Sequence, residues 1–130
     1  MTRILRTLAV LAAALIGAIP AMAAAFSPVG QWQVATGEAR YSVTACGKDG
    51  ALLCAKLVWL APGERTPENL ALLNTYVVRG AAAVDENQWS GNVVFNGKAY
   101  AGSMTLVSNN SMKLKGCSGI LCQTVEFVRI

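Results

Sequence analysis

The chain of 130 residues contains no histidine, the side chain that most often serves enzymes as a general base. Nucleophilic pairs of the Ser-His and Cys-His types are therefore excluded. The sequence also lacks the G-x-x-x-x-G-K run of a phosphate-binding loop and the C-x-x-C spacing of a redox site. Lysines and arginines are scattered, without the basic cluster that marks nucleic-acid binding. These absences predict a protein that is not an enzyme, uses no cofactor or metal and binds no nucleic acid.

Acidic side chains are scarce too, with seven in the whole chain. Most of them fall in expected turns or on the expected polar face of a sheet, so they do not suggest a catalytic pair of carboxylates. Asp85 and Glu86, for example, are interpreted as a solvated turn.

The N-terminal stretch has no acidic residue before Glu38. It contains two arginines, an apolar run over residues 8–19, a proline and a small-residue site that ends at Ala23. A charged start, an apolar run and a small-residue site in this order are typical of a secretory signal peptide. We therefore predict a cleavable signal peptide over residues 1–23, with an alternative cut after Ala25.

A transmembrane anchor is the competing interpretation of this stretch. The apolar run is too short to span a bilayer comfortably, and no basic stop follows it. We expect a periplasmic or secreted protein without a stable membrane anchor, and its oligomeric state is left open. The mature part, residues 24–130, is long enough for a single domain and not for two.

Four cysteines follow the predicted signal peptide, namely Cys46, Cys54, Cys117 and Cys122. An even number of cysteines in an exported chain favours disulfides. Zinc is the alternative, but the gaps of seven and four residues differ from the two-residue gap of a zinc knuckle, and no histidine is available.

Short stretches with the composition of β-strands alternate with turn signals such as Asn96-Gly97 along the mature chain. One longer connection, Pro62–Asn74, contains a predicted short helix with Pro67 in its first turn. This order predicts an all-β fold, an eight-stranded antiparallel up-and-down barrel of the lipocalin-like kind with one short helix. The predicted strands are Gln31–Ala35, Arg40–Cys46, Leu53–Leu60, Tyr76–Val84, Gln88–Phe95, Ala99–Val107, Ser111–Cys117 and Leu121–Arg129.

Apolar and polar side chains alternate along most of these strands, as in a sheet with one dry face. The predicted inner face consists of Trp32, Val34, Tyr41, Val43, Ala45, Ala55, Leu57, Trp59, Trp89, Gly91, Val93, Phe95, Tyr100, Gly102, Met104, Leu106, Met112, Leu114, Leu121, Gln123, Val125 and Phe127.

The same alternation places all four cysteines on the outer face. Cys46 and Cys54 fall at facing ends of one hairpin, and Cys117 and Cys122 at facing ends of another. Bridged cysteines must be close and point the same way, so we predict the pairs Cys46–Cys54 and Cys117–Cys122. The other two connectivities would require distant hairpins to touch through their outer faces.

Several motifs in order resemble a known family, the exported bacterial proteins of domain of unknown function 2147. The resemblance covers nearly the whole mature chain but implies no activity, because the family has none assigned. A central stretch, residues 65–70, is more apolar here, and the family's closing tryptophan is Phe127. The matching motifs are Gly30-Gln31-Trp32, Cys46, Leu53-Cys54-Ala55-Lys56-Leu57-Val58-Trp59-Leu60, Trp89-Ser90-Gly91-Asn92-Val93, Asn96-Gly97-Lys98-Ala99-Tyr100, Leu114-Lys115-Gly116-Cys117 and Phe127-Val128-Arg129.

A tryptophan on the first strand and an arginine at the end of the last strand also resemble the lipocalin-type barrel. That resemblance implies that Arg129 lies across the ring of Trp32 and closes the barrel floor. Such a cation–π contact is worth roughly 0.5–2 kcal/mol. The alternative is a core tryptophan and a solvated terminal charge.

The predicted inner face suggests that the barrel holds a small apolar ligand. Gly91 and Gly102 are expected to leave room for it, and the Pro62–Asn74 connection is expected to act as a lid, with Leu70, Leu72 and Leu73 over the mouth. The candidate ligand-binding residues are Tyr41, Trp59, Trp89, Phe95, Tyr100, Met104, Met112, Gln123 and Phe127.

Two alternatives to ligand binding stay open at this point. The same side chains would also form a packed core without a cavity. In that case the protein would be a periplasmic structural or protein-interaction module, for envelope stress or assembly, and would expose an apolar patch. Residues 70–73 together with residues 76–78 are the expected patch.

Overall fold

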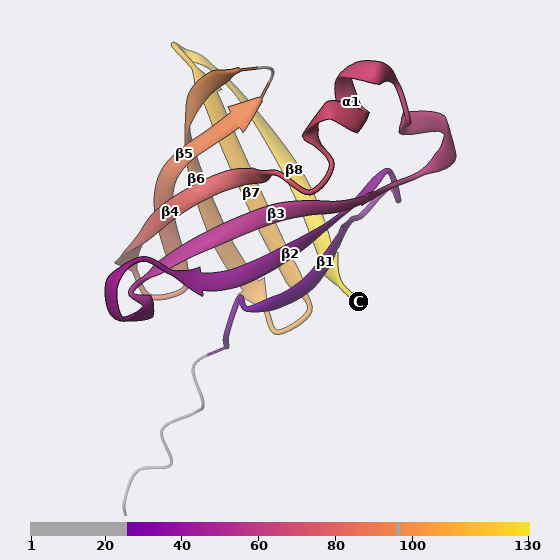
Figure 1. Cartoon of the computed structure of the whole chain (residues 1–130). Coiled ribbons are helices and arrows are strands. Elements are labelled where there is room, and N and C mark those ends of the chain that lie inside the picture. The colour runs from indigo at the N-terminus through magenta and orange to yellow at the C-terminus, as the bar shows by residue number, and fades with distance from the viewer. Residues whose placement is uncertain (1–25, 96) are drawn as a thin grey trace, which may run out of the picture.

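A computed structural model describes residues 26–95 and 97–130, so the predicted signal peptide over residues 1–23 lies outside the described part. Eight antiparallel strands follow one another around a closed barrel, and the first strand pairs with the last (Figure 1). The predicted all-β up-and-down barrel is therefore confirmed. The strands are β1 (Gly30–Val34), β2 (Ala39–Cys46), β3 (Leu52–Leu60), β4 (Tyr76–Asp85), β5 (Gln88–Phe95), β6 (Lys98–Ser108), β7 (Ser111–Ser118) and β8 (Leu121–Arg129).

Every strand begins and ends within one residue of the predicted bounds. Two short 3-10 turns, η1 (Lys48–Gly50) and η2 (Pro62–Glu64), and one helix, α1 (Pro67–Leu72), lie in the connections. The helix begins where its sequence dictates: the Thr66 side chain accepts a hydrogen bond from the Asn69 backbone N–H, and Pro67 occupies the first turn, where its missing N–H is not needed.

The two ends of the barrel differ in what they carry. The N-terminal arm, η1 and the β4–β5 and β6–β7 turns lie at one end, which we call the closed end. The β1–β2 loop, η2, α1 and the β5–β6 and β7–β8 turns lie at the other, which we call the open end. Figure 1 shows α1 far from the N-terminal arm, at the open end.

The closed end is built around Trp32, whose side chain is fully buried. Its indole N–H donates a hydrogen bond to the carbonyl oxygen of Pro28 at 2.8 Å. The guanidinium of Arg129 lies 4.3 Å from the centre of its ring. Indole and guanidinium thus form the stacked floor that the lipocalin-type resemblance implies.

Arg129 also ties three segments together at this floor. Its guanidinium donates hydrogen bonds to the carbonyl oxygens of Asn109 at 2.6 Å, Val29 at 2.9 Å and Ser27. Gly30 allows this approach, because a Cβ atom at that position would lie 2.6 Å from the Arg129 guanidinium. Gly30 also has φ near +144°, a conformation that side chains disfavour.

Trp59 lies on the outer face, so its predicted inward position is wrong. Opposite the step from Arg40 to Tyr41 in β2, the register of β3 moves from Trp59 to Leu57, which leaves Val58 as an extra residue. A bulge of this kind reverses the side-chain alternation beyond it. Leu60 is therefore buried, and the Trp59 ring lies outside beneath the Arg40 guanidinium, at 4.3 Å.

The predicted inner-face side chains in the first half of β8 are not buried. The register of β1 with β8 runs only from Trp32 to Val34, so residues 121–125 have no β1 partner. Leu121 is 75% exposed, and Gln123 and Val125 are exposed as well. The wall of the barrel is consequently open between β8 and the β1–β2 loop.

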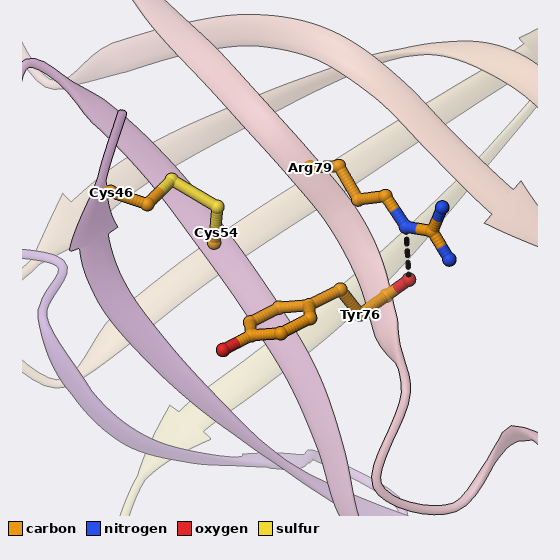
Figure 2. Close-up of a disulfide and its surroundings, with 4 residues drawn as sticks. All are labelled: Cys46, Cys54, Tyr76 and Arg79. Carbon is orange, nitrogen blue, oxygen red and sulfur yellow. Dashed lines mark hydrogen bonds between the residues drawn. A yellow bond between two sulfur atoms is a disulfide. The ribbon is translucent and has the colours of Figure 1, made fainter. Parts of the chain in front are cut away.

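Both predicted disulfides are present, Cys46–Cys54 near the closed end and Cys117–Cys122 at the open end. Figure 2 shows the first, which joins the neighbouring strands β2 and β3. Arg79 of β4 is the register partner of Cys54 and donates a hydrogen bond to the Tyr76 carbonyl at 3.4 Å. The second bridge joins directly opposed residues of β7 and β8.

Candidate functional site

A cavity of about 620 Å³ occupies the open end of the barrel. Most of its lining is apolar and comes from strands on all sides except β5, together with α1 and the β1–β2 loop. A volume of this size is in the range of small-ligand pockets. The lining residues are Val34, Ala35, Thr36, Glu38, Ala39, Tyr41, Val43, Ala55, Leu57, Leu60, Glu64, Asn69, Leu72, Val77, Val78, Met104, Met112, Leu114, Thr124, Val125, Glu126 and Phe127.

The connection between β3 and β4 covers part of the mouth. Leu72 lines the cavity, and Leu72 and Leu73 pack against the core. Leu70 instead faces outward and is 44% exposed. Two of the three leucines expected in the lid therefore point inward.

A second hollow of about 510 Å³ lies beside the first and shares Leu114 and Val125 with it. Its wall comes from β5, β6, β7 and the unpaired half of β8. Tyr100 and Gln123 line this second hollow and do not line the first. The open end thus carries two adjoining hollows, whereas Trp32 at the closed end lines neither of them.

Tyr41 is the main neutral polar residue deep in the larger cavity. Its ring meets that of Phe127 edge to face, with 5.5 Å between the ring centres. Burial raises the pKa of the Tyr41 hydroxyl above its usual value of 10.0, because the phenolate form would lose its hydration. The hydroxyl therefore stays neutral at physiological pH and can donate or accept one hydrogen bond to a ligand.

Carboxylates gather on one side of the mouth. The Ala61 N–H donates to the Glu38 carbonyl at 2.8 Å, and the Glu64 N–H donates to the Ala61 carbonyl at 2.9 Å. These bonds hold the β1–β2 loop against η2, so that Glu38 and Glu64 both line the cavity. Glu126 of β8 also borders the cavity, but its side chain pairs with the exposed Lys113 on the outer face.

The cavity has no cationic side chain in its lining, as far as residues 26–95 and 97–130 are concerned. The nearby Arg65 donates from Nε to the Leu60 carbonyl at 3.1 Å. Across the described residues the single ion pair is Lys113 with Glu126, at 3.8 Å between nitrogen and oxygen. The mouth therefore carries an acidic rim on one side of an apolar interior.

The structure gathers six of the nine candidate ligand-binding residues at the open end. Tyr41, Met104, Met112 and Phe127 line the larger cavity, and Tyr100 and Gln123 line the smaller hollow. Trp59 lies outside the barrel, and Trp89 packs against the core without lining either space. The side chain of Phe95 is outside the described part of the chain.

The two glycines expected to leave room for a ligand do not do so. An added Cβ on Gly91 would lie 2.9 Å from Cα of Ala81, and one on Gly102 would lie 2.5 Å from the Val93 side chain. Both glycines therefore allow close packing between neighbouring strands rather than a ligand. The cavity lies elsewhere, because α1 and the β1–β2 loop extend the wall beyond the strands.

Sequence reasoning missed two groups of lining residues. Val77 and Val78 are adjacent and both buried, because register shifts interrupt the alternation of β4. Glu38 and Glu64 are two of the seven acidic residues, most of which were expected in turns or on the polar face of the sheet. Their signal was positional: both lie in connections that an up-and-down barrel brings to the same end.

Two further observations apply to the described residues only. Residues 26–95 and 97–130 hold no group of three or more cysteine, aspartate or glutamate side chains placed to bind a metal ion. No helix among them has the length and apolar character to cross a membrane.

The sequence of this barrel matches one known protein family. Residues 30–129 match the family described as an uncharacterized protein conserved in bacteria, DUF2147. The chain belongs to this family. The matched residues include every strand of the barrel, so the family assignment covers both the floor and the cavity.

One solved structure shows the same fold as this DUF2147 member. It is described as "Protein HP1028 from the human pathogen Helicobacter pylori belongs to the lipocalin family". The TM-score is 0.60 at 13% sequence identity, over 80% of this chain and 83% of that chain. At this identity the likeness concerns the fold alone, which is a lipocalin-like barrel. None of the curated proteins matches the sequence.

Proposed function

We propose that this protein is an exported, non-enzymatic barrel that holds a small apolar ligand at its open end. The observation that carries the proposal is the cavity of about 620 Å³, which is walled by apolar side chains and sits above a sealed floor. A barrel of eight strands has room either for a packed interior or for one small ligand. Here the interior is packed at one end and hollow at the other.

The absence of histidine supports a binding role rather than catalysis, since the commonest general base is missing. Tyr41 offers one neutral hydrogen-bonding group to orient a ligand, and Met104 and Met112 offer adaptable apolar contacts. This combination of apolar walls and few polar groups is typical of sites that bind and release a ligand unchanged.

Export is part of the proposal. The order of charged, apolar and small residues over positions 1–23 supports a cleaved signal peptide. The two disulfides, with no free cysteine among the described residues, support folding in an oxidising compartment such as the periplasm or the cell exterior.

The rival function, an interaction module with an apolar patch, fits less well. Of the expected patch, Val77 and Val78 are buried, while Leu72 and Leu73 pack against the core. Only Leu70, Ala71 and Tyr76 remain exposed, which is too little for a contiguous docking surface.

A fluorescence titration tests the proposal. N-phenyl-1-naphthylamine, a neutral apolar probe, should bind the mature protein in a saturable manner and become more fluorescent. Intrinsic tryptophan fluorescence is a poorer reporter, because neither Trp59 nor Trp89 lines the cavity. Val34→Trp should fill the mouth and weaken binding by at least about tenfold, since Val34 lines the cavity.

Val107→Trp is the matched control, because Val107 is 55% exposed and lines neither space. It should leave the affinity unchanged. Far-UV circular dichroism before and after each titration establishes that both variants are folded. Non-saturable binding to the wild type, or equal binding by the two variants, would refute ligand binding at this site.

A further inference from the structure

We propose that the open-end cavity selects amphiphiles with a cationic head, such as a protonated amine on an apolar chain, and discriminates against fatty-acid carboxylates. This inference rests on the proposed binding function and adds the charge of the ligand to it. The site is the apolar cavity itself. The carboxylates at its mouth decide which head group the cavity accepts.

The cavity separates its apolar and charged lining in space. Its depth is made by side chains such as Val43, Leu57 and Met112, which are buried. Its charged lining belongs to the β1–β2 loop and the β3–β4 connection at the mouth. An apolar chain in the depth therefore places its head group near Glu38 and Glu64.

The charge of that rim is not neutralised from within the cavity. Glu38 accepts a hydrogen bond from the Thr36 hydroxyl, which stabilises a carboxylate without cancelling its charge. Neither Glu38 nor Glu64 has an ion pair within the described residues. A ligand ammonium would supply the missing cation, whereas a ligand carboxylate would meet two like charges.

The side opening of the barrel gives such a head group access to water. Because β1 ends at Val34, the β8 residues Thr124 and Val125 border both the cavity and the gap in the wall. A charged head at this position keeps part of its hydration, so a cation can bind there without the full penalty of burial. The apolar chain alone needs to enter the interior.

Isothermal titration calorimetry with three ligands of equal chain length provides the test. n-Decylamine is protonated at pH 7, n-decanol is neutral and n-decanoate is anionic. Each is titrated at low ionic strength and below its aggregation concentration. We expect decylamine to bind the mature protein about tenfold more tightly than decanoate, with decanol between them.

The variants Glu38→Gln and Glu64→Gln remove the rim charges while keeping side-chain size. The double variant should weaken decylamine binding about three- to tenfold and strengthen decanoate binding, leaving decanol unchanged. The matched control is the double variant Glu68→Gln and Glu86→Gln. It makes the same chemical change at two exposed residues that do not line the cavity. This control variant should keep the wild-type order of affinities.

The outcomes separate this inference from the proposed function. The order amine, alcohol, carboxylate, lost in the rim variant and kept in the control, supports cation selection. Equal binding of the three ligands, tighter binding of decanoate, or the same loss in the control variant overturns cation selection while ligand binding stands. Binding of none of the three, together with no saturable binding of N-phenyl-1-naphthylamine, overturns both.

Discussion

The closed and open ends of this barrel use similar components for opposite purposes. Each end carries one disulfide and is contacted by segments that connect the strands. At the closed end the connecting segments are bonded to Arg129 and leave no space above Trp32, which is fully buried. At the open end the connecting segments stand away from the strands and enclose a cavity of about 620 Å³.

The difference between the ends follows from the shortness of β1 relative to β8. β1 has five residues and β8 has nine, so β1 can pair with β8 only near the closed end. Where the pairing continues, the barrel closes and its core is dry. Where it stops, the wall opens and the lining becomes accessible. Stability should therefore be concentrated at the closed end and binding at the open end.

Replacement of Trp32 should have the largest effect. Trp32→Ala removes a fully buried indole and is expected to lower the free energy of unfolding by about 4 kcal/mol, whereas Leu72→Ala in the half-buried lid should lower it by about 1 kcal/mol. Guanidinium unfolding followed by far-UV circular dichroism measures both. If Trp32→Ala does not fold, Trp32→Phe should still be more destabilising than Leu72→Ala. Equal losses at the two positions would contradict the division between the ends.

Replacement of Arg129 comes next, because this side chain stacks on Trp32 and donates to three carbonyl oxygens. Arg129→Ala should lower the free energy of unfolding by about 3 kcal/mol. Arg40→Ala is the matched control: its guanidinium also lies 4.3 Å from an indole centre, that of Trp59, but it has one hydrogen bond, to Gln33. We expect a loss of about 1 kcal/mol there. A larger loss at Arg40 would show that the stacked pair, and not the floor, carries the stability.

The two disulfides should contribute similarly to stability but differently to function. Replacing Cys46 and Cys54 by alanine should lower the free energy of unfolding by about 2.5 kcal/mol, and replacing Cys117 and Cys122 by about 2 kcal/mol, from the sizes of the loops they close. Cys117 lines the smaller hollow beside the cavity, so only the second change should weaken N-phenyl-1-naphthylamine binding. Denaturation and probe titration of both variants would show this, and weaker binding after loss of Cys46–Cys54 would break the comparison.

Tyr41 should give the smallest effect, visible only at high pH. Burial raises its pKa in the folded chain above the value of about 10 in the unfolded chain. As the pH rises through 10, the unfolded chain loses a proton that the folded chain keeps, so the free energy of unfolding falls. Tyr41→Phe should remove this part of the slope between pH 9 and pH 11 and change nothing between pH 6 and pH 8. Identical slopes for the variant and the wild type would show that this hydroxyl is hydrated.

Most of the fold could be predicted from the sequence, because side chains alternate with period two wherever a strand is regular. The alternation also predicted both disulfide pairs, which the structure confirms. It failed at Val58 and along β4, where bulges shift the register without any mark in the local composition. It failed as well at Leu121 and Gln123, whose burial depends on a partner strand that ends too early.

The site was harder to predict than the fold. Tyr41 and Met112 were found because they point inward from regular strands. Glu38 and Glu64 were not, since their position depends on backbone hydrogen bonds between two connections. Trp59 shows the opposite error, because a large aromatic residue was assumed to belong inside. The β1–β2 loop and the β3–β4 connection determine the chemistry of the cavity mouth. Side chains in such connecting segments follow no periodic pattern.

The hydrogen bonds of Arg129 also determine when the barrel can close during synthesis of the chain. The floor joins Arg129 to Ser27 and Val29, so it links nearly the first described residue to nearly the last. A nascent chain on the ribosome can form neither the β1–β8 pairing nor this floor until β8 and Arg129 have been made, and contacts of such sequence separation form slowly. The barrel therefore cannot close before β8 has been synthesised. In the exported chain that we propose, closure of the barrel would accordingly be one of the last steps of folding.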